Sequence, residues 1–203
     1  MNDLDEIYTR EWYRFDFEGL QPEFDLVGDA IARAFPGVEY SVDAGCGPGM
    51  LVRRLAHRGL MTWGFEGSTH ALDYAREFAP ETNWSALIAH ADLRSLSTLN
   101  HFHNEHRRPE LVICTEVLEH VEVQHAERVV QLLCSPMAPV VVTAAPPGQD
   151  GHHHVNCQPP AYWISLFEAQ GAFYDGDLTN EMARRWSGLK RLSHMVRNVM
   201  VFR

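Results

Sequence analysis

The 203-residue chain has 45% hydrophobic and 22% charged residues, a composition that excludes an intrinsically disordered protein and can supply a buried core. Its formal net charge of −10 disfavours a general affinity for nucleic-acid backbones, which requires a dense cationic surface. Residues 1–10 are polar and acidic, and no apolar run approaches the roughly 18 to 20 residues of a membrane span. We therefore expect neither a secretory signal nor a membrane partner.

Cysteine usage and the C-terminal charges give two further expectations. Cys46, Cys114, Cys134 and Cys157 form no CxxC pair, and a chain of this size does not need disulfide stapling. We therefore predict free thiols and a cytoplasmic location. Residues 184–203 contain six basic residues and no acidic residue, which predicts either a solvated basic surface or a patch for an anionic substrate.

The chain begins with residues 1–38, where aromatic side chains stand among acids: Tyr8, Trp12, Tyr13, Phe15 and Phe17. This pattern predicts a helix and loop over the domain, and it leaves open whether the aromatic residues pack the core or form a lid over a ligand. Residues 39–44 then predict a strand, residues 45–49 a glycine-rich turn, and residues 50–58 an amphipathic helix.

Strands and helices alternate along the following segments. Predicted strands lie at residues 61–66, 86–90, 110–114 and 138–143, and predicted helices at residues 69–78 and 125–134. Within the last two of these strands, residues 111–114 and 138–142 are continuously apolar, as is typical of parallel strands covered on both faces. The alternation predicts an α/β fold: a doubly wound, mostly parallel, Rossmann-like sheet of about seven strands with helices on both faces.

The last third of the chain completes this domain. Residues 161–170 predict a helix that begins after two prolines and ends before Gly171, and residues 198–202 predict a final strand. No repeat or linker divides the chain, so we predict one domain over residues 1–203. Its parts are an N-terminal segment (1–38), a ligand-binding core (39–178) and a basic C-terminal segment (179–203).

The glycine-rich turn is the first candidate binding site. Asp43, Gly45, Gly47 and Gly49 occupy alternate positions between a predicted strand and a predicted helix. In α/β sheets, ligands bind beyond the carboxyl ends of strands, and glycines let backbone N–H groups approach them closely. The even spacing does not match the dinucleotide-binding fingerprint, and the sequence contains no phosphate-binding P-loop motif.

This turn and three later segments together resemble the motifs of class I S-adenosylmethionine-dependent methyltransferases, in particular small-molecule and ubiquinone-pathway-like O-methyltransferases. Glu66 ends the second predicted strand, 21 residues after Gly45, and Asp92 follows the third. Residues 110–120 resemble the fourth motif, with an acid before the strand and Glu-Val-Leu-Glu-His after it. The resemblance covers about residues 39–178 and implies S-adenosylmethionine as the cofactor.

The resemblance also implies roles for individual residues. Glu66 would accept hydrogen bonds from both ribose hydroxyls, Asp92 would receive the adenine amino group, and the Leu93 backbone would contact the ring. Asp43 would order the glycine loop and hold the cationic amino end of the methionine moiety, indirectly or through water. The cofactor-binding residues implied are Asp43, Gly45, Cys46, Gly47, Gly49, Glu66, Gly67, Asp92, Leu93, Thr115 and Glu116.

Carboxylates and imidazoles gather at the same edge of the predicted sheet. Glu116, Glu119 and His120 share a face if their segment is helical, and three histidines follow the fifth strand at residues 152–154. One interpretation is a divalent-metal site made of Glu116, Glu119, His120 and His153, which resembles the site of small-RNA 2′-O-methyltransferases. We favour no metal and a histidine general base, His120 or His154, because imidazole titrates near neutrality. A third interpretation is that the histidines only hydrogen-bond the loop.

The acceptor is the least defined part of the prediction. Asn156, Tyr162 and Trp163 are candidates to line its pocket, and Trp163 is equally a candidate for core packing. We predict an enzyme that methylates a small-molecule or carbohydrate-like acceptor at oxygen. The alternatives are a metal-assisted RNA 2′-O-methyltransferase and a protein that binds S-adenosylmethionine without transferring its methyl group. The oligomeric state is not determined by the sequence.

Overall fold

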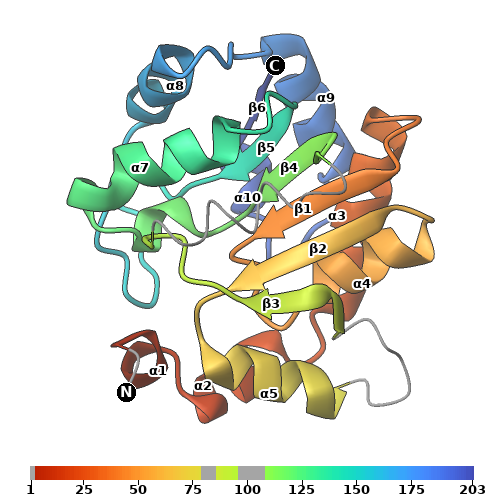
Figure 1. The fold of residues 1–203 in the computed structure, drawn as a ribbon, viewed down its shortest axis with the longest axis vertical. Coiled ribbons are helices and arrows are strands. Elements are labelled where there is room, and N and C mark those ends of the chain that lie inside the picture. The colour runs from red at the N-terminus through yellow and green to blue at the C-terminus, as the bar shows by residue number, and fades with distance from the viewer. Residues whose placement is uncertain (1–2, 79–85, 96–107) are drawn as a thin grey trace.

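A computed structural model describes residues 3–78, 86–95 and 108–203 of the chain. Within these ranges, six strands form one sheet in the order β3-β2-β1-β4-β5-β6 (Figure 1). The strands are β1 (Tyr40–Ala44), β2 (Met61–Glu66), β3 (Ile88–His90), β4 (Leu111–Cys114), β5 (Val140–Thr143) and β6 (Val199–Phe202). β1 to β5 pair in parallel, and β6 runs antiparallel to β5. The predicted α/β class and mostly parallel sheet are confirmed.

The predicted count of about seven strands is wrong for the described ranges, where the sheet has six. Beside β6, only an isolated bridge forms, between Tyr174 and Phe202. Asp175 follows at once and caps the next helix, because its side chain accepts a hydrogen bond from the Leu178 N–H at 2.8 Å. The extended segment therefore ends before it can form a seventh strand.

Helices cover both faces of the sheet (Figure 1). They are α1 (Asp3–Ile7), α2 (Arg10–Phe17), α3 (Gln21–Ala34), α4 (Met50–His57), α5 (Thr69–Phe78), the 3₁₀ helix η2 (Leu118–His120), α7 (Val123–Cys134), α8 (Pro160–Ala169), α9 (Gly176–Arg185) and α10 (Met195–Asn198). α7 and α8 lie on one face, and α3, α4 and α9 lie on the other. In the described ranges, no helix combines the length and apolar character needed to cross a bilayer.

Alternation along the strands produces the two halves of the core. In β4, Val112 and Cys114 pack in the cluster with α7 and α8, whereas Leu111 and Ile113 pack in the cluster with α3, α4 and α9. All four side chains have no exposed surface. A strand buried on both faces is continuously apolar, which explains the sequence of β4.

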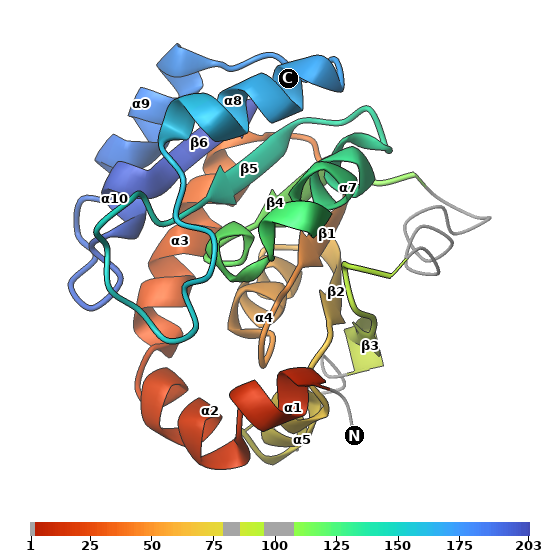
Figure 2. The ribbon, with the colours of Figure 1, turned by 90° about the vertical axis from the view of Figure 1, so that its left-hand side faces the viewer.

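The chain order reverses at β1, because β2 lies on one side of it and β4 on the other. Such a reversal leaves a crevice beyond the carboxyl ends of the strands, and ligands bind there in open α/β sheets. Figure 2 shows α1 and α2 at this end of the sheet, beside α5. The N-terminal segment therefore lies over the crevice.

Candidate functional site

The glycine loop after β1 has a backbone that other residues rarely adopt. Gly45, Gly47 and Gly49 have φ values of 75°, 53° and 76°. A Cβ on Gly45 would lie 2.5 Å from a methyl carbon of Val117, so the loop and the segment after β4 approach closely only because position 45 is glycine. The N–H groups of Gly45 and Cys46 donate to the Phe65 carbonyl at 2.7 and 3.1 Å, which fixes the loop against the end of β2.

Glu66, at the end of β2, orders the loop through its carboxylate. One oxygen accepts from the Gly47 N–H at 2.8 Å, and the other accepts from the Ser68 N–H at 2.7 Å. Burial raises the pKa of Glu66, although these backbone donors oppose the shift. Each carboxylate oxygen has two lone pairs, so Glu66 retains acceptor capacity for a pair of ligand hydroxyls.

Asp43 is a second buried carboxyl at this end of the sheet. Its side chain is 2% exposed. Burial, and then the negative charge of Glu66, raise the pKa of Asp43 to about 7. The carboxyl of Asp43 therefore ionises within the physiological pH range, and its ionised form could bind a cationic ligand group.

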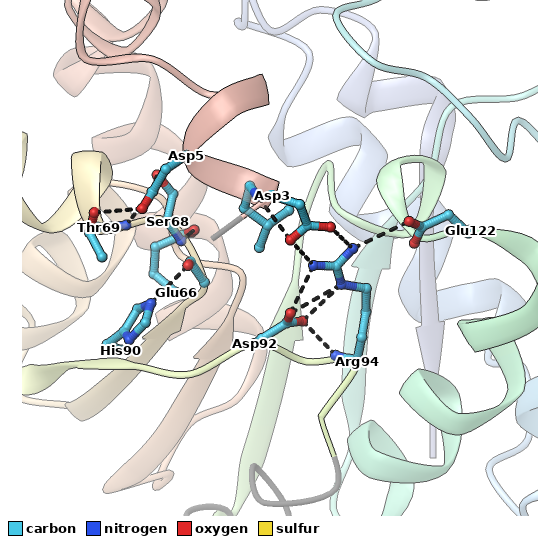
Figure 3. A network of polar contacts seen from close by, with 11 residues as sticks. Asp3, Asp5, Glu66, Ser68, Thr69, His90, Asp92, Arg94 and Glu122 are labelled. Atoms are coloured by element: carbon cyan, nitrogen blue, oxygen red, sulfur yellow. Dashed lines mark hydrogen bonds and ion pairs between the residues drawn. The ribbon is translucent and has the colours of Figure 1, made fainter. Parts of the chain in front are cut away.

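Asp92, which follows β3, belongs to a network of ionic contacts (Figure 3). It accepts from the Arg94 N–H at 2.8 Å and from the Arg94 guanidinium at 2.8 Å. The same guanidinium bonds Asp3 of α1 at 2.8 Å and Glu122 at 3.2 Å. The residue predicted to hold adenine is thus connected to the N-terminal segment through Arg94.

A first cavity, which we call the cofactor chamber, has a volume of about 140 Å³. Its walls include most of the cofactor-binding residues implied by the sequence, namely Gly45, Gly47, Glu66, Gly67, Asp92, Leu93 and Glu116. α1 and α2 supply the opposite wall through Leu4, Tyr8, Trp12, Tyr13 and Phe17. Four of the five N-terminal aromatic residues therefore line a cavity, and the same four also pack in one hydrophobic cluster, so both sequence interpretations describe them. The fifth, Phe15, is 81% exposed.

A second cavity, which we call the acceptor chamber because the candidate base His154 lines it, has a volume of about 400 Å³. Its walls include Asp43, Cys46, Thr115, His152, His154 and His194. Both chambers are lined by Gly45, Gly47, Glu116 and His120. Gly49 lines neither chamber and instead caps α4 with a left-handed backbone.

Glu116 lies where the two chambers meet, and its backbone is strained. It has a φ of 56°, a left-handed conformation that is uncommon for a residue with a side chain. Its N–H donates to the Thr143 hydroxyl at 2.7 Å, which ties the end of β4 to the end of β5. One carboxylate oxygen pairs with His194 Nε2 at 2.8 Å, while the other is buried and has no partner among the described residues.

His194 is a site residue that the sequence analysis missed. It precedes α10, inside the basic C-terminal segment, and no local motif marks it. Its hydrogen bond to Glu116 raises the pKa of His194. Burial opposes ionisation of Glu116, but the hydrogen bond and charge of His194 hold the pKa of Glu116 below its usual range. The contact therefore favours the ionised form of each partner.

The structure does not bring the four predicted metal ligands together. The helical face expected for Glu116, Glu119 and His120 is wrong, because Glu116 is left-handed and the 3₁₀ helix begins only at Leu118. Glu116 instead pairs with His194, and the His153 carbonyl bonds His120 Nδ1 at 3.1 Å. A different trio remains in which one donor atom from each member lies within 4.8 Å of the others: Glu119, His120 and His154.

Within this trio, Glu119 has a structural role. Its side chain is fully buried and accepts from the Ala145 N–H at 3.0 Å, and its carbonyl accepts from the N–H groups of Val155 and Asn156 at 3.0 and 2.9 Å. Burial and the charge of Glu116 raise the pKa of Glu119 to about 8. Glu119 thereby fastens the loop after β5 to the segment after β4.

His120 and His154 each have one ring nitrogen bonded to a carbonyl. His120 Nδ1 bonds His153 O at 3.1 Å, and His154 Nδ1 bonds Gln149 O at 3.0 Å. These contacts assign the ring proton of a neutral imidazole to Nδ1 and leave the Nε2 lone pair available to accept a proton. Burial lowers the pKa of His120 to about 4, so it is neutral at pH 7.

The predicted pocket residues after the histidines do not line either chamber. Trp163 has no exposed surface and packs in the core cluster, with Tyr162 beside it at a ring-centroid distance of 4.9 Å. Asn156 is 3% exposed and bonds Gln158 at 2.9 Å. Of the two interpretations of Trp163, the structure supports core packing.

Comparison with known proteins defines the class. Residues 42–139 match the family model described as a methyltransferase domain. Magnesium protoporphyrin IX methyltransferase from Synechocystis PCC 6803, solved with bound SAM, is 24% identical, with 78% of this chain and 71% of that chain covered and a TM-score of 0.57. DesVI from Streptomyces venezuelae is 14% identical, with 93% and 95% covered and a TM-score of 0.64. No curated protein sequence matches the chain.

A third solved structure is the sugar N-methyltransferase KedS8 from Streptoalloteichus sp ATCC 53650, at 15% identity, 94% and 90% coverage and a TM-score of 0.63. Together these findings confirm the class I methyltransferase fold predicted from the motifs. The chain therefore carries a methyltransferase domain with the class I S-adenosylmethionine-dependent methyltransferase fold. The residues present fit this cofactor, because glycines at 45 and 47 open a cradle beside the Glu66 carboxylate.

Proposed function

We propose that this enzyme methylates a hydroxyl group of a small or carbohydrate-like molecule. The observation that carries the proposal is the pair of adjoining chambers, which share Glu116 and His120. The acceptor chamber, at about 400 Å³, falls within the roughly 300 to 1,000 Å³ of small-molecule sites. Sugar and porphyrin methyltransferases among the solved neighbours agree with an acceptor of this kind.

The residues proposed to hold the cofactor follow the edge of the sheet. Glu66 accepts the ribose hydroxyls while it keeps the glycine loop ordered, and Asp92 and Leu93 contact the adenine. Asp43 and the loop N–H groups face the methionine end. Gly67 completes the ribose side, and Thr115 and Glu116 separate the methionine end from the acceptor. Their positions around the two chambers support this assignment.

S-adenosylmethionine, when bound, supplies a methyl group that is already activated for transfer. The protein's contribution is then alignment of the acceptor oxygen and removal of its proton. His120 is the proposed base, since its Nε2 lone pair is available and it lines both chambers. A pKa of about 4 makes His120 a weak base, but one that is unprotonated across the physiological range. His154 is the second candidate.

Three of the six basic residues of the C-terminal segment are paired within the chain, which weakens the RNA alternative. The Arg191 guanidinium donates to the carbonyls of Glu18 and Asp16 at 2.7 and 2.9 Å. Arg185 pairs with Glu181 at 2.6 Å, and Arg203 pairs with Asp175 at 2.9 Å. These guanidinium groups contact the chain itself. We further propose a single catalytic domain over residues 1–203 and a cytoplasmic location, which agrees with four free cysteines.

The first test is isothermal titration with S-adenosylmethionine and S-adenosylhomocysteine. Wild type is expected to bind both, and Glu66→Ala is expected to bind at least about tenfold more weakly, because two charged hydrogen bonds are lost. Glu181→Gln, on the exposed side of α9, is the matched control and should bind like wild type. Absence of binding by the wild type would contradict the cofactor assignment.

The second test separates transfer from binding. Wild type is incubated with a panel of monosaccharides and small phenols, and S-adenosylhomocysteine release is measured. His120→Gln should lower turnover by roughly 100-fold or more without loss of cofactor affinity, as expected for removal of a general base. Tight binding without turnover on every acceptor would favour the alternative of a binding protein. Loss of turnover after EDTA treatment would favour the metal alternative.

A further inference from the structure

We propose that the Glu116 carboxylate selects the acceptor by accepting a hydrogen bond from a second hydroxyl group, one that is not methylated. We further propose that Glu23 is a positioning residue, which holds the segment of His194, the partner of Glu116. The acceptor is then a polyhydroxylated molecule of the carbohydrate class, and a compound with a single hydroxyl is a poor substrate. The inference rests on the proposed function, in which His120 takes the proton of the reacting hydroxyl.

The Glu116 carboxylate lies at the boundary of the two chambers and can accept further hydrogen bonds. Its side chain is 24% exposed and lines both chambers, as His120 does. One oxygen bonds His194 Nε2 at 2.8 Å, and the other has no hydrogen-bond partner among the described residues. An ionised carboxylate has about four acceptor sites and donates no hydrogen bond, so a ligand must bring an O–H or N–H group to it.

The neighbours of Glu116 indicate that this donor belongs to the acceptor and not to the cofactor. His194 lines the acceptor chamber and is absent from the walls of the cofactor chamber. Glu116 has a φ of 56°, and its N–H bond to the Thr143 hydroxyl at 2.7 Å fixes that backbone so that the carboxylate meets His194. The cationic end of the methionine moiety has a buried carboxyl of its own in Asp43.

The acceptor chamber also suits a ligand with several hydroxyl groups. Three parts of the chain supply polar side chains to its walls: Asp16 of α2, Thr115 after β4, and Gln149 and Asp150 after β5. Carboxylate and amide oxygens accept hydrogen bonds from hydroxyl groups. A ligand with only the reacting hydroxyl would leave the Glu116 carboxylate without a donor. A recognition group left unpaired in the complex costs transition-state affinity.

Glu23 of α3 holds the segment that carries His194. Its carboxylate accepts from three successive backbone N–H groups, those of Lys190, Arg191 and Leu192, at 3.0, 3.0 and 2.9 Å. Burial opposes ionisation of Glu23, but these three donors hold its pKa below the usual range. The carboxylate therefore fixes the backbone two residues before His194. Through that histidine, Glu23 determines where the Glu116 carboxylate lies.

The test is a scan of the acceptor hydroxyls, with S-adenosylhomocysteine release as the readout. The best monosaccharide of the panel above is compared with its monodeoxy analogues, and the methylated position is identified by NMR. Besides the reacting hydroxyl, one further hydroxyl should matter. Its deoxy analogue should have a kcat/KM about 10- to 100-fold below that of the parent sugar, as expected for a hydrogen bond to a charged group.

Variants of Glu116 show whether its carboxylate recognises this hydroxyl. In Glu116→Ala, the deoxy penalty should fall below about threefold, and Glu116→Gln, which keeps one acceptor oxygen, should have an intermediate penalty. A purely structural role would lower the turnover of both sugars by the same factor and leave the penalty unchanged. S-adenosylmethionine affinity, measured by isothermal titration, should stay within about threefold of wild type in both variants.

A matched pair of variants tests the positioning role of Glu23. Glu23→Gln should reduce the deoxy penalty by about threefold or more, because two N–H groups of the segment lose a charged acceptor. Asp25→Asn changes a carboxylate on the same α3 that faces Arg54 instead, and it should keep the wild-type penalty. An unchanged penalty in Glu23→Gln, or an equal reduction in Asp25→Asn, would overturn this role.

Four results would overturn the selection by Glu116. They are a scan in which only the reacting hydroxyl matters, a deoxy penalty that persists in Glu116→Ala, a tenfold loss of S-adenosylmethionine affinity in that variant, and turnover of phenols without turnover of any monosaccharide. The last result would leave the proposed transfer to a hydroxyl group intact. A wild type that methylates no acceptor of either kind would instead contradict the proposed function, and the inference with it.

Discussion

We expect the affinity for S-adenosylmethionine to fall below pH 7, because of Asp43. In the free protein the carboxyl of Asp43 is 2% exposed, and burial together with the charge of Glu66 raises its pKa to about 7. A cationic methionine end would stabilise the ionised form and lower this pKa in the complex. Below pH 7, the protein must therefore release a proton when it binds the cofactor.

The magnitude follows from the fraction of ionised carboxylate. With a pKa of about 7, roughly one tenth of Asp43 is ionised at pH 6 and roughly nine tenths at pH 8. The dissociation constant at pH 6 should therefore be about tenfold larger than at pH 8, which corresponds to about 1.4 kcal/mol. Isothermal titration in buffers of different ionisation enthalpy would measure both the affinity and the proton released.

Asp43→Asn separates this effect from other titrating groups in the site. The variant should bind with an affinity that varies much less between pH 6 and pH 8, and it should release much less proton. Glu66 also has a raised pKa, so any pH dependence that survives in the variant belongs to Glu66 or to another group. Equal wild-type affinity at pH 6 and pH 8 would refute the reasoning, as would an unchanged pH dependence in Asp43→Asn.

Two further predictions concern strain and charge at the site. Gly45→Ala should lower the free energy of unfolding by about 2 to 5 kcal/mol, because alanine is strained in a left-handed backbone and its Cβ would clash with Val117. Gly37→Ala should lower it by only about 1 to 2 kcal/mol, because nothing lies within 4 Å of its Cβ. Equal losses of the two variants in urea denaturation would contradict this reasoning. His194→Gln should cost about 1 kcal/mol at pH 6 and less at pH 9, because the raised pKa of His194 makes its pairing with Glu116 fully present below pH 6.5 and weaker as pH rises through the folded value. A loss that is constant or that grows with pH would count against the ion pair.

The alternation of strands and helices could be predicted because each strand and helix has its own local sequence pattern. β2 and α5 have the predicted bounds, and they are defined by local periodicity and by a preceding turn. α9 was not predicted, although its signals are present: Asp175 caps it, and Leu178 and Met182 are spaced four residues apart on its buried side. Most residues of α9 are polar, so its few buried positions do not stand out as a helical pattern in the sequence.

The position of Glu66 and Asp92 at one edge of the sheet could be predicted for a related reason. Glu66 and Asp92 follow strands, and parallel strands deliver their carboxyl ends to one edge of the sheet. The surroundings of Glu116 depend on backbone conformations and distant contacts that no spacing encodes. Glu116 adopts a left-handed conformation, and its partner His194 is 78 residues away in the chain. The assumption that residues 116–120 form a helix therefore placed Glu116 wrongly, and it gave no indication of His194.

The contacts of the N-terminal segment also bear on how the site forms during synthesis. The Ile7 carbonyl bonds His152, 145 residues later in the chain, and Asp3 bonds Arg94, 91 residues later. At about 5 to 20 residues per second, His152 is made roughly 7 to 30 s after Ile7. Over that interval the aromatic side chains of Tyr8 and Trp12 lack the histidine that they contact in the folded protein. The acceptor chamber, which His152 lines, is therefore completed late, after the first strands of the sheet have been made.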